Sequence, residues 1–455
     1  MSFVSPIFLV LFLPLVFLLY FITPKKYKNL LLVFVSLFFY FWNEGLYVLH
    51  ILFWVIVNYV FSLQISKSVG LVSKFHLVVI VVFNILILGY FKYTNFLFPA
   101  TSVIYLPLAI SFFAFHAIAY NVDVYRRVNK PEKNLLNLML YFTFFPHLIA
   151  GPIIRYHQIS KNIKLKNISI ENISQGLFRV ICGVAKKILI ADTFAPIVNE
   201  IFALSPYNLS AAELWLGAIL FSLQIYYDFS GYSDIAIGLA KVFGFTFPEN
   251  FNYPYISTSV TEFWKRWHIT LSNWFKDYLY IPLGGNRKGA LRTYINLFIV
   301  FVACGFWHGA NWTFLVWGMF HGIILILERI KNGTLVNWMP QFIRRFYTLI
   351  FLLTSWVIFR SENLVYAKSY IKNMLTFSTS VTYVYYPISY FLDKDILLAL
   401  VFGTILAFPL IRQRLSTYKG WHKEIVKTML FVLLFILFLI AASSETYKTF
   451  IYFRF

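Results

Sequence analysis

The chain has 455 residues, of which 60% are hydrophobic and 13% are charged, and its formal net charge is +21. About a quarter of the residues in an ordinary soluble domain are charged, so this composition excludes a soluble globular protein and indicates an integral membrane protein. The positive charge does not indicate nucleic-acid binding, because the Lys and Arg residues lie between apolar segments, as they do in cytoplasmic loops that face anionic lipid.

The first part of the chain contains five apolar segments that we predict to be membrane helices. They cover residues 3–23, 29–42, 46–65, 75–90 and 104–120. The first segment has no basic residue before it and no small-residue cleavage site, so we interpret it as a retained helix and not as a signal peptide. The positive-inside rule places Lys25, Lys67 and Arg126 in the cytoplasm, and all five segments then agree on an extracytoplasmic N-terminus.

The next part of the chain is less regular. Residues 135–149 are apolar but end at Ala150-Gly151-Pro152, before a basic run that starts at Arg155. A simple crossing would place this basic run outside, against the positive-inside rule, so we predict a re-entrant or broken segment with Gly-Pro as the break. Residues 176–202 form a further apolar stretch that Lys186-Lys187 interrupts, and residues 214–227 lead into a polar turn at residues 228–234.

The last third of the chain returns to apolar spans after a polar stretch. Residues 249–289 are too polar to cross lipid alone, and an interfacial amphipathic or re-entrant helix fits them. Crossings follow at 291–307 and 311–328, and the last spans cover 345–359, 396–411 and 426–442. No internal repeat or domain boundary is visible, so we predict an all-α, multi-pass bundle that forms one membrane-embedded domain over residues 1–455.

His308 lies between two apolar runs and is the strongest candidate for chemistry. An ionisable residue at membrane depth is costly and is a functional candidate by default; the alternative is a histidine satisfied by a neighbouring carbonyl group. Basic residues at both outer ends make the two runs a hairpin with His308 near its apex. The helix from Arg292 to His308 is about 24 Å long, short of a ~30 Å hydrocarbon core, so His308 would lie inside the membrane. Asn311 is the predicted N-cap of the second helix, whose free N–H groups would stabilise an oxyanion.

Other polar residues each allow two interpretations. His268, in a basic aromatic segment, is either a donor-binding or proton-handling residue or an interfacial anchor. Asp228 and Ser230 either line a hydrated cavity or cap the next helix, and capping is the preferred interpretation. Arg155 either holds a phosphate or extends its side chain to the membrane surface. His321 would be ~20 Å from His308 on one straight helix, so we expect it to be structural.

Several chemistries have no motif in this sequence. There is no G-x-x-x-x-G-K-[ST], H-E-x-x-H or G-x-S-x-G sequence, and no site for a redox or hydride cofactor is visible. Cys182 and Cys304 provide neither a disulfide framework nor zinc-binding spacing. We therefore expect no metal site and no resident cofactor.

An ordered set of motifs along almost the whole chain resembles the membrane-bound O-acyltransferase family, in particular its bacterial alginate O-acetyltransferase-like branch, which includes membrane subunits of peptidoglycan O-acetyltransferases. These motifs are LIAGPI (148–153), DFSGYSDIAIG (228–238), PENFNYPY (248–255), FWKRWHITLS (263–272), YIPLGGNR (280–287), WHGANW (307–312), WGMFHG (317–322) and FIYFRF (450–455). The D-alanyl transfer proteins of teichoic acid modification are more distantly similar.

The resemblance implies a fold and an activity. The fold would be a helical bundle with re-entrant and interfacial helices around a central tunnel, in which a cytosolic acyl donor meets an acceptor from outside. The near-invariant histidine of the family corresponds to His308, and a second important histidine corresponds to His268. In this branch the acetyl group is commonly passed to an extracytoplasmic partner acyltransferase.

These inferences predict an O-acetyltransferase of the bacterial cytoplasmic membrane. His308 would be the general base on an acceptor hydroxyl, which attacks the thioester of acetyl-CoA. The partners would be acetyl-CoA, an extracytoplasmic glycan such as alginate or peptidoglycan, a periplasmic acetyltransferase and the lipid bilayer, with no nucleic acid. The alternatives are a glycan transporter or flippase, or a scaffold for a periplasmic acetylase. The expected donor- or acceptor-binding residues are Trp264, Arg266, Trp267, Asn311, Trp312, Asp228, Ser230 and Arg155.

Overall fold

The computed structural model describes residues 1–98, 103–330, 338–376, 387–410 and 421–443. All regular secondary structure in these ranges is helical. Five helical stretches in them are long and apolar enough to cross a membrane, namely Lys25–Lys67, Gly70–Leu97, Gly289–His308, Trp312–Arg329 and Gln341–Arg360. The prediction of an all-α, multi-pass membrane protein is confirmed. The sequence motif at residues 450–455 lies outside the described residues.

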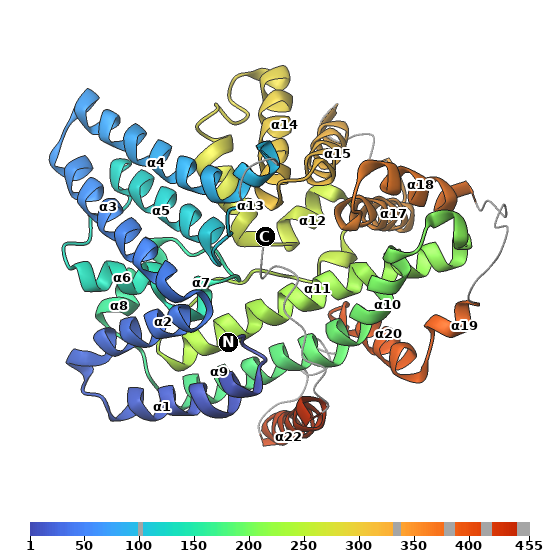
Figure 1. The fold of residues 1–455 in the computed structure, drawn as a ribbon, viewed down its shortest axis with the longest axis horizontal. Helices are drawn as coiled ribbons and strands as arrows, with labels where there is room; N and C mark the ends of the chain where they lie inside the picture. Colours follow the sequence, from blue (N-terminus) through green and yellow to red (C-terminus); the bar gives the residue numbers. More distant parts are fainter. Residues whose placement is uncertain (99–102, 331–337, 377–386, 411–420, 444–455) are drawn as a thin grey trace. The chain divides into compact units, whose positions relative to one another are not determined.

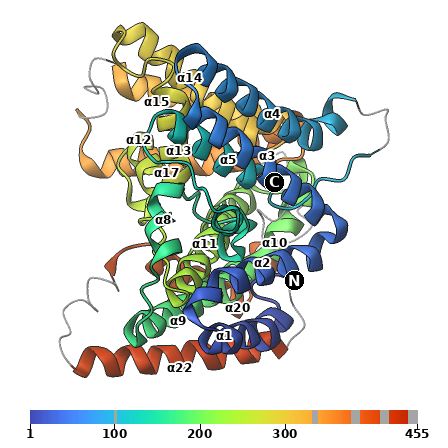
Figure 2. The same ribbon diagram turned by 90° about the vertical axis from the view of Figure 1, so that its left-hand side faces the viewer.

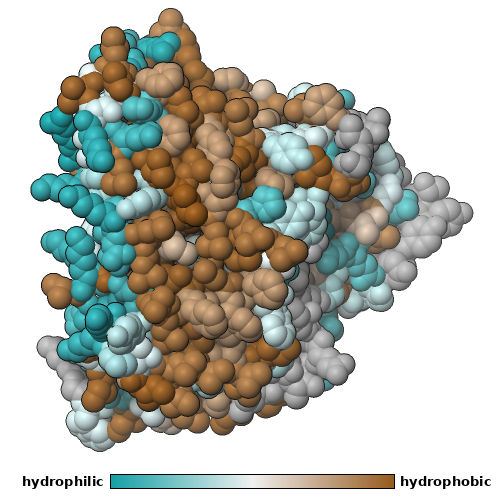
Figure 3. Space-filling model, turned by 60° about the vertical axis from the view of Figure 1, so that its left-hand side comes forward, coloured by the Kyte–Doolittle hydropathy of each residue, from teal (hydrophilic) through white to brown (hydrophobic). Residues whose placement is uncertain are grey.

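Large apolar side chains are exposed in a way that suits lipid and not water. Figure 3 shows them gathered over a broad area of one face, with hydrophilic side chains along its margin. Phe34, Phe53, Leu71 and Phe75 of the N-terminal helices are among the exposed apolar residues. A patch of this extent on a soluble protein would cause association, whereas in a bilayer the acyl chains solvate it.

The chain divides into two compact units. The first contains Met1–Val184 and Tyr232–Glu249, and the second contains Ala185–Gly231 and the described residues from Asn250 to Ser443. The prediction of a single domain over residues 1–455 stays a prediction. One helix, α11 (Ala211–Val242), contributes its first part to the second unit and its last part to the first.

The first unit is built from the N-terminal helices (Figure 1). Its helices are η1 (Ile7–Phe12), α1 (Leu13–Ile22), η2 (Lys25–Tyr27), α2 (Lys28–Glu44), η3 (Gly45–Tyr47), α3 (Val48–Lys67), α4 (Gly70–Leu97), α5 (Ile110–Tyr125), α6 (Leu135–Thr143), α7 (Phe145–Leu148), α8 (Tyr156–Lys164) and α9 (Ile170–Ala185). Helices η1–α1 and α2 to α5 lie at the first five predicted spans, with boundaries that differ by up to about seven residues. Of these, Lys25–Lys67 and Gly70–Leu97 are long and apolar enough to cross a membrane.

Buried asparagines join three of these helices. Asn84 of α4 donates to Asn58 of α3 at 3.0 Å, and Asn121 of α5 donates to the same oxygen of Asn58 at 2.8 Å. All three side chains are fully buried. Interhelical hydrogen bonds of this kind stabilise helix association where both helices are already in an apolar solvent.

The predicted break after residue 135 is present. The helical path is interrupted at Phe144, between α6 and α7, and α7 ends at Leu148. Gly151 then adopts a φ of 104°, a left-handed conformation that only glycine reaches without strain. The prediction of a broken segment is therefore confirmed.

The second unit contains the remaining helices (Figures 1 and 2). They are η4 (Lys186–Ala191), α10 (Asp192–Ala203), η5 (Pro206–Asn208), η6 (Pro254–Ile256), α12 (Val260–Arg266), α13 (Ile269–Phe275), η7 (Lys276–Tyr280), α14 (Gly289–His308), α15 (Trp312–Arg329), α17 (Gln341–Arg360), α18 (Leu364–Thr376), α19 (Ile388–Phe391), α20 (Lys394–Leu406) and α22 (Trp421–Ser443). The polar stretch from residue 249 thus forms short helices, not one long amphipathic helix.

One expectation about this region is wrong. The polar residues from Asp228 to Asp234 are not a turn and do not cap a helix, because they lie in the middle of α11. The two carboxylates of this segment are in ion pairs instead. Within the first unit, Arg179 of α9 bonds Asp234 at 2.8 Å; within the second, Lys187 of η4 bonds Asp228 at 2.6 Å. Such pairs allow charged residues to continue a buried helix.

Candidate active site

The α14–α15 hairpin forms the frame of the candidate site. Its two helices touch through glycine: a Cβ atom added to Gly318 would clash with the carbonyl oxygen of Phe301, and one added to Gly305 would clash with that of Phe314. Small residues let two membrane helices approach backbone to backbone. Asn311 accepts a hydrogen bond from the Thr313 N–H at 3.0 Å, so the prediction that it is the N-cap of α15 is confirmed.

His308 is the last residue of α14, at the apex of the hairpin as predicted. Its side chain is 2% exposed. Three aromatic rings surround the imidazole, with centroid distances of 4.8 Å to Trp307, 5.0 Å to Trp317 and 5.3 Å to Phe359. These rings exclude water from most of the imidazole surface. A catalytic role for His308 stays a prediction.

His321 is closer to His308 than the straight-helix estimate suggested. The chain reverses at Gly309–Asn311, and Trp317 contacts both imidazoles, at 5.0 Å from His308 and 4.7 Å from His321. The indole N–H of Trp264 in α12 donates to Nδ1 of His321 at 3.2 Å. This bond holds α12 against α15, and it is consistent with the structural role expected for His321.

Glu328 fixes the other end of α12. Its carboxylate accepts hydrogen bonds from the backbone N–H groups of Val260 and Thr261, at 2.7 and 2.8 Å, and from the Thr261 hydroxyl at 2.6 Å. These N–H groups have no partner inside the helix, because they belong to its first turn. Glu328 and His321 therefore attach both turns of α12 to α15. The role of Glu328 was not predicted from the sequence. The feature that could have indicated it is a single acidic residue at the end of an apolar span.

His268 connects α12 to α13 in a left-handed conformation, with φ 41° and ψ 54°. This region is sparsely populated by residues other than glycine, although histidine is among those that enter it more often. Strained backbone of this kind costs about 1–3 kcal/mol and persists where the surroundings impose it. Here the imidazole is fully buried against Phe229, at 4.7 Å between ring centroids, and the ring of Trp307 is 6.4 Å away.

Asn250 determines which nitrogen of His268 is protonated. Its Oδ1 accepts hydrogen bonds from the Thr270 hydroxyl at 2.8 Å and from the Thr270 N–H at 3.3 Å. The atom facing Nδ1 of His268 at 3.1 Å is thus an acceptor, so Nδ1 donates and Nε2 keeps a lone pair. That Nε2 is buried and has no hydrogen-bond partner within the described ranges. Sequence analysis did not single out Asn250.

His268 is a neutral ring whose Nε2 can accept a hydrogen bond. It lies outside the candidate membrane-spanning helices. Burial lowers the pKa of its imidazole to about 3, so the ring is neutral near pH 7. Trp307 therefore lies near two buried histidines, with ring centroids 4.8 Å from His308 and 6.4 Å from His268. The fold has brought together the two histidines predicted to be catalytic.

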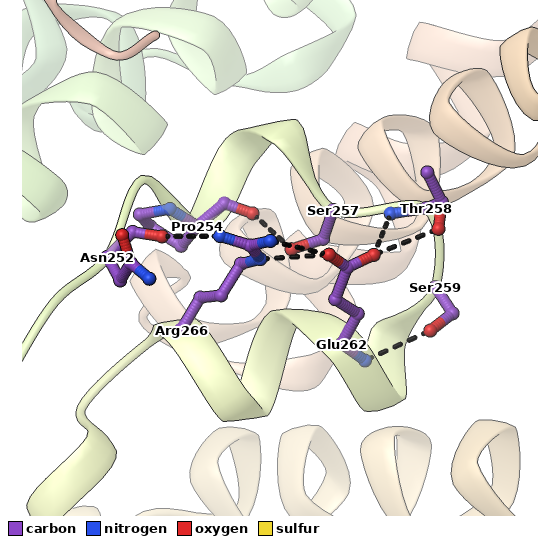
Figure 4. A network of polar contacts seen from close by, with 7 residues as sticks. All are labelled: Asn252, Pro254, Ser257, Thr258, Ser259, Glu262 and Arg266. Carbon is purple, nitrogen blue, oxygen red and sulfur yellow. Dashed lines mark hydrogen bonds and ion pairs between the residues drawn. The ribbon is translucent and has the colours of Figure 1, made fainter. Parts of the chain in front are cut away.

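The basic aromatic segment around His268 is largely occupied by contacts within the second unit. Figure 4 shows the Arg266 guanidinium between the Glu262 carboxylate and the Asn252 carbonyl, with bonds of 2.9 and 3.1 Å. Trp267 is buried, with its ring 5.4 Å from that of Phe263. Contact of Arg266 or Trp267 with a donor stays a prediction, as it does for Trp264 and for the exposed Trp312.

The remaining expected binding residues lie in different surroundings. Asp228 is 1% exposed and pairs with Lys187, which also bonds Asp192 at 2.7 Å. Ser230 is buried on the same helix. Arg155 precedes α8 in the first unit, where its backbone N–H donates to Gln158. Their binding roles stay predictions. Within the described residues, no three His, Cys, Asp or Glu side chains are placed to hold a metal ion.

Comparisons with known proteins agree with this picture. The model of the membrane-bound O-acyltransferase family matches residues 92–366, which include both histidines. The chain is 42% identical to a protein of Azotobacter vinelandii named "probable alginate O-acetylase", over 80% of this chain and 76% of that protein. It is 38% identical to peptidoglycan O-acetyltransferase of Helicobacter pylori, over 82% and 79%, and 27% identical to teichoic acid D-alanyltransferase of Bacillus subtilis, over 51% and 62%.

Proposed function

We propose a specific reaction for this chain, which belongs to the membrane-bound O-acyltransferase family and is an acyltransferase. The group transferred is acetyl, the donor is acetyl-CoA on the cytosolic side, and the final acceptor is an extracytoplasmic cell-envelope polysaccharide. Relatives named for O-acetylation of alginate and of peptidoglycan support acetyl transfer to a polysaccharide. The transfer is either direct or passes through a periplasmic partner acetyltransferase in the bacterial cytoplasmic membrane.

The observation that supports this proposal best is that two buried histidines, His268 and His308, both lie near the ring of Trp307. His308 is the proposed general base, and general-base catalysis typically contributes about 10²–10⁴-fold. Nδ1 of His268 is held as a donor by Asn250, which leaves Nε2 as the basic atom. The aromatic rings around His308 keep water from competing with the acceptor hydroxyl.

The proposed reaction conserves atoms and protons. His308 removes the proton of the acceptor hydroxyl while the oxygen attacks the thioester carbon. The tetrahedral oxyanion is stabilised by N–H groups at the start of α15, where the helix dipole is positive. The carbon–sulfur bond then breaks, and the proton passes from the imidazolium to the thiolate, which leaves as coenzyme A. His268 assists by accepting a proton at Nε2 or by orienting the acceptor.

Donor recognition would use the basic aromatic segment. The positive charge of the chain favours an anionic cytosolic donor. Trp264 and Trp267 would contact the donor, and Arg266 would approach its phosphates after exchanging one of its present hydrogen bonds. Asn311, Trp312, Asp228, Ser230 and Arg155 would line the path of donor or acceptor.

Acetyl transfer in proteoliposomes tests the proposal. Purified protein receives radiolabelled acetyl-CoA on the cytoplasmic side, with candidate glycans and a periplasmic partner fraction on the other side. We expect His308→Ala to reduce transmembrane label by at least about 100-fold, the loss of a general base. His50→Ala is the matched control, because His50 is exposed and belongs to the first unit. Equal label from folded His308→Ala and wild type would move the reacting group elsewhere.

A further inference from the structure

A groove in the second unit lies beside the candidate site and shares one lining residue, Trp264, with the donor segment of the proposed reaction. Its volume is about 370 Å³, and it is open on one side. One wall is made by Leu297, Val300 and Phe301 of α14 and the other by Leu271 and Phe275 of α13. Most of the lining is apolar, so the greater part of any occupant is a hydrocarbon.

The apolar wall runs along the membrane-spanning part of α14. From Leu297 to Cys304 it covers about 10 Å of helix. α15 runs antiparallel to α14, since Gly305 approaches Gly318 and a Cβ atom on Gly322 would lie 3.4 Å from the Phe298 ring. Arg329, at the end of α15, is therefore level with the beginning of α14, and Cys304 is at the other end of the groove.

Cationic side chains also line the groove. Lys265, Lys276 and Arg329 line it, and no Asp or Glu is among its lining residues. Two hydroxyl groups also line it, those of Ser272 and Tyr280, and both are buried without a hydrogen-bond partner in the described part of the chain. Cations and spare hydroxyl donors are the groups that bind a phosphate.

We propose that this groove binds one anionic phospholipid of the surrounding membrane, with its phosphate at Lys265, Lys276 and Arg329 and an acyl chain along α14. Charge complementarity selects an anionic headgroup, and the apolar wall at membrane depth selects an acyl chain. A nucleotide thioester would leave its polar pantetheine and ribose against Leu297, Val300 and Phe301, so the lining favours a lipid.

Such a lipid would contact α12, the helix that leads into His268. Trp264 lines the groove and donates to His321, and Lys265 follows it on α12. A bound chain would fill the space between α12–α13 and the hairpin, and it would favour the arrangement in which His268 and His308 both contact Trp307. The lipid would thus act as a structural ligand of the site and not as a substrate.

Photolabelling in vesicles tests the proposal independently of acetyl transfer. The full chain is reconstituted in phosphatidylcholine vesicles with a trace of phosphatidylglycerol that carries a diazirine in its acyl chain. We expect the labelled peptide to contain residues 297–304 of α14. Replacing Lys265, Lys276 and Arg329 together by Gln should weaken the binding of the probe roughly 100-fold, because each cation near an anionic lipid contributes about fivefold.

The control removes the same charge from neighbouring positions. Arg287→Gln, Lys288→Gln and Arg292→Gln together change three exposed cations that do not line the groove, and labelling should persist. Both triple variants are first compared with wild type by thermal unfolding, and Lys276→Gln alone serves if either fails to fold. Equal labelling of the two variants, equal labelling by the phosphatidylcholine analogue, or displacement by millimolar coenzyme A would overturn the lipid assignment. None of these results depends on whether the chain transfers acetyl groups.

Discussion

Replacing Asn250 by Ala should impair the reaction through the tautomer of His268. The Asn250 oxygen is the acceptor for Nδ1–H of His268 at 3.1 Å and for the hydroxyl and N–H of Thr270 at 2.8 and 3.3 Å. Without it, nothing on that side favours protonation of Nδ1, and the ring can place its proton on Nε2 instead. The basic atom would then point away from the reacting groups.

The magnitude follows from the hydrogen bonds removed. A net contribution of about 0.5–1.5 kcal/mol for the bond to His268 corresponds to a fall in kcat of roughly 2- to 10-fold, with KM nearly unchanged. The two Thr270 donors that lose this acceptor cost about 1–3 kcal/mol each, so the free energy of unfolding should also fall, by about 2–6 kcal/mol. Asn250→Asp keeps an acceptor at this position and should retain Nε2 as the base.

The assay is acetyl transfer in proteoliposomes at equal amounts of folded protein, measured over a range of pH. Asn252→Ala is the matched control, because Asn252 is exposed and makes its described hydrogen bonds through its backbone. A folded Asn250→Ala protein with wild-type kcat and pH profile would show that the tautomer of His268 does not matter to the reaction.

Three further predictions concern stability. Glu328→Ala should lower the free energy of unfolding by about 2–4 kcal/mol, because the Glu328 carboxylate caps the first turn of α12. Glu328→Gln should lower it by less, and thermal unfolding in detergent measures both variants. Gly318→Ala should separate the hairpin helices and cost about 1–3 kcal/mol with loss of acetyl transfer. Gly322→Ala is the control, because its Cβ would meet no atom closer than 3.3 Å; similar melting temperatures for the two variants would contradict this packing. The pKa of His268 is about 3 in the folded protein and 6.5 in the unfolded chain, so between these pH values the unfolded chain binds one more proton. The free energy of unfolding therefore falls as the pH falls from 6.5 to 3, by up to about 1.4 kcal/mol per pH unit. His268→Gln should therefore show a shallower dependence of melting temperature on pH between 6.5 and 4, and unchanged slopes would refute the burial of a neutral ring.

The polar residues of α11 show where local sequence was misleading. Asp228, Ser230 and Asp234 are common in turns and helix caps, and local propensity favoured a turn. The structure continues the helix through them because distant residues, Lys187 and Arg179, satisfy the carboxylates. No local pattern reports a partner that is more than forty residues away in the chain. The interruption at Lys186-Lys187 was visible in the sequence, and its form as a turn of π-helix was not.

The sequence by itself determined that this is a multi-pass helical membrane protein, where its apolar helices lie, and that the chain breaks near Gly151. It also determined that one helix ends at His308 and that Asn311 caps the next helix. These features depend on the length and apolarity of each segment and on residues only a few positions apart. Tertiary structure alone decided that His268 and His308 contact the same ring of Trp307, that Asn250 selects the tautomer of His268, and that Glu328 holds α12. Each of these contacts depends on how helices from separate parts of the chain pack. Packing is set by side-chain shape and by hydrogen bonds between distant residues, and the hydropathy pattern of the sequence gives no information about either.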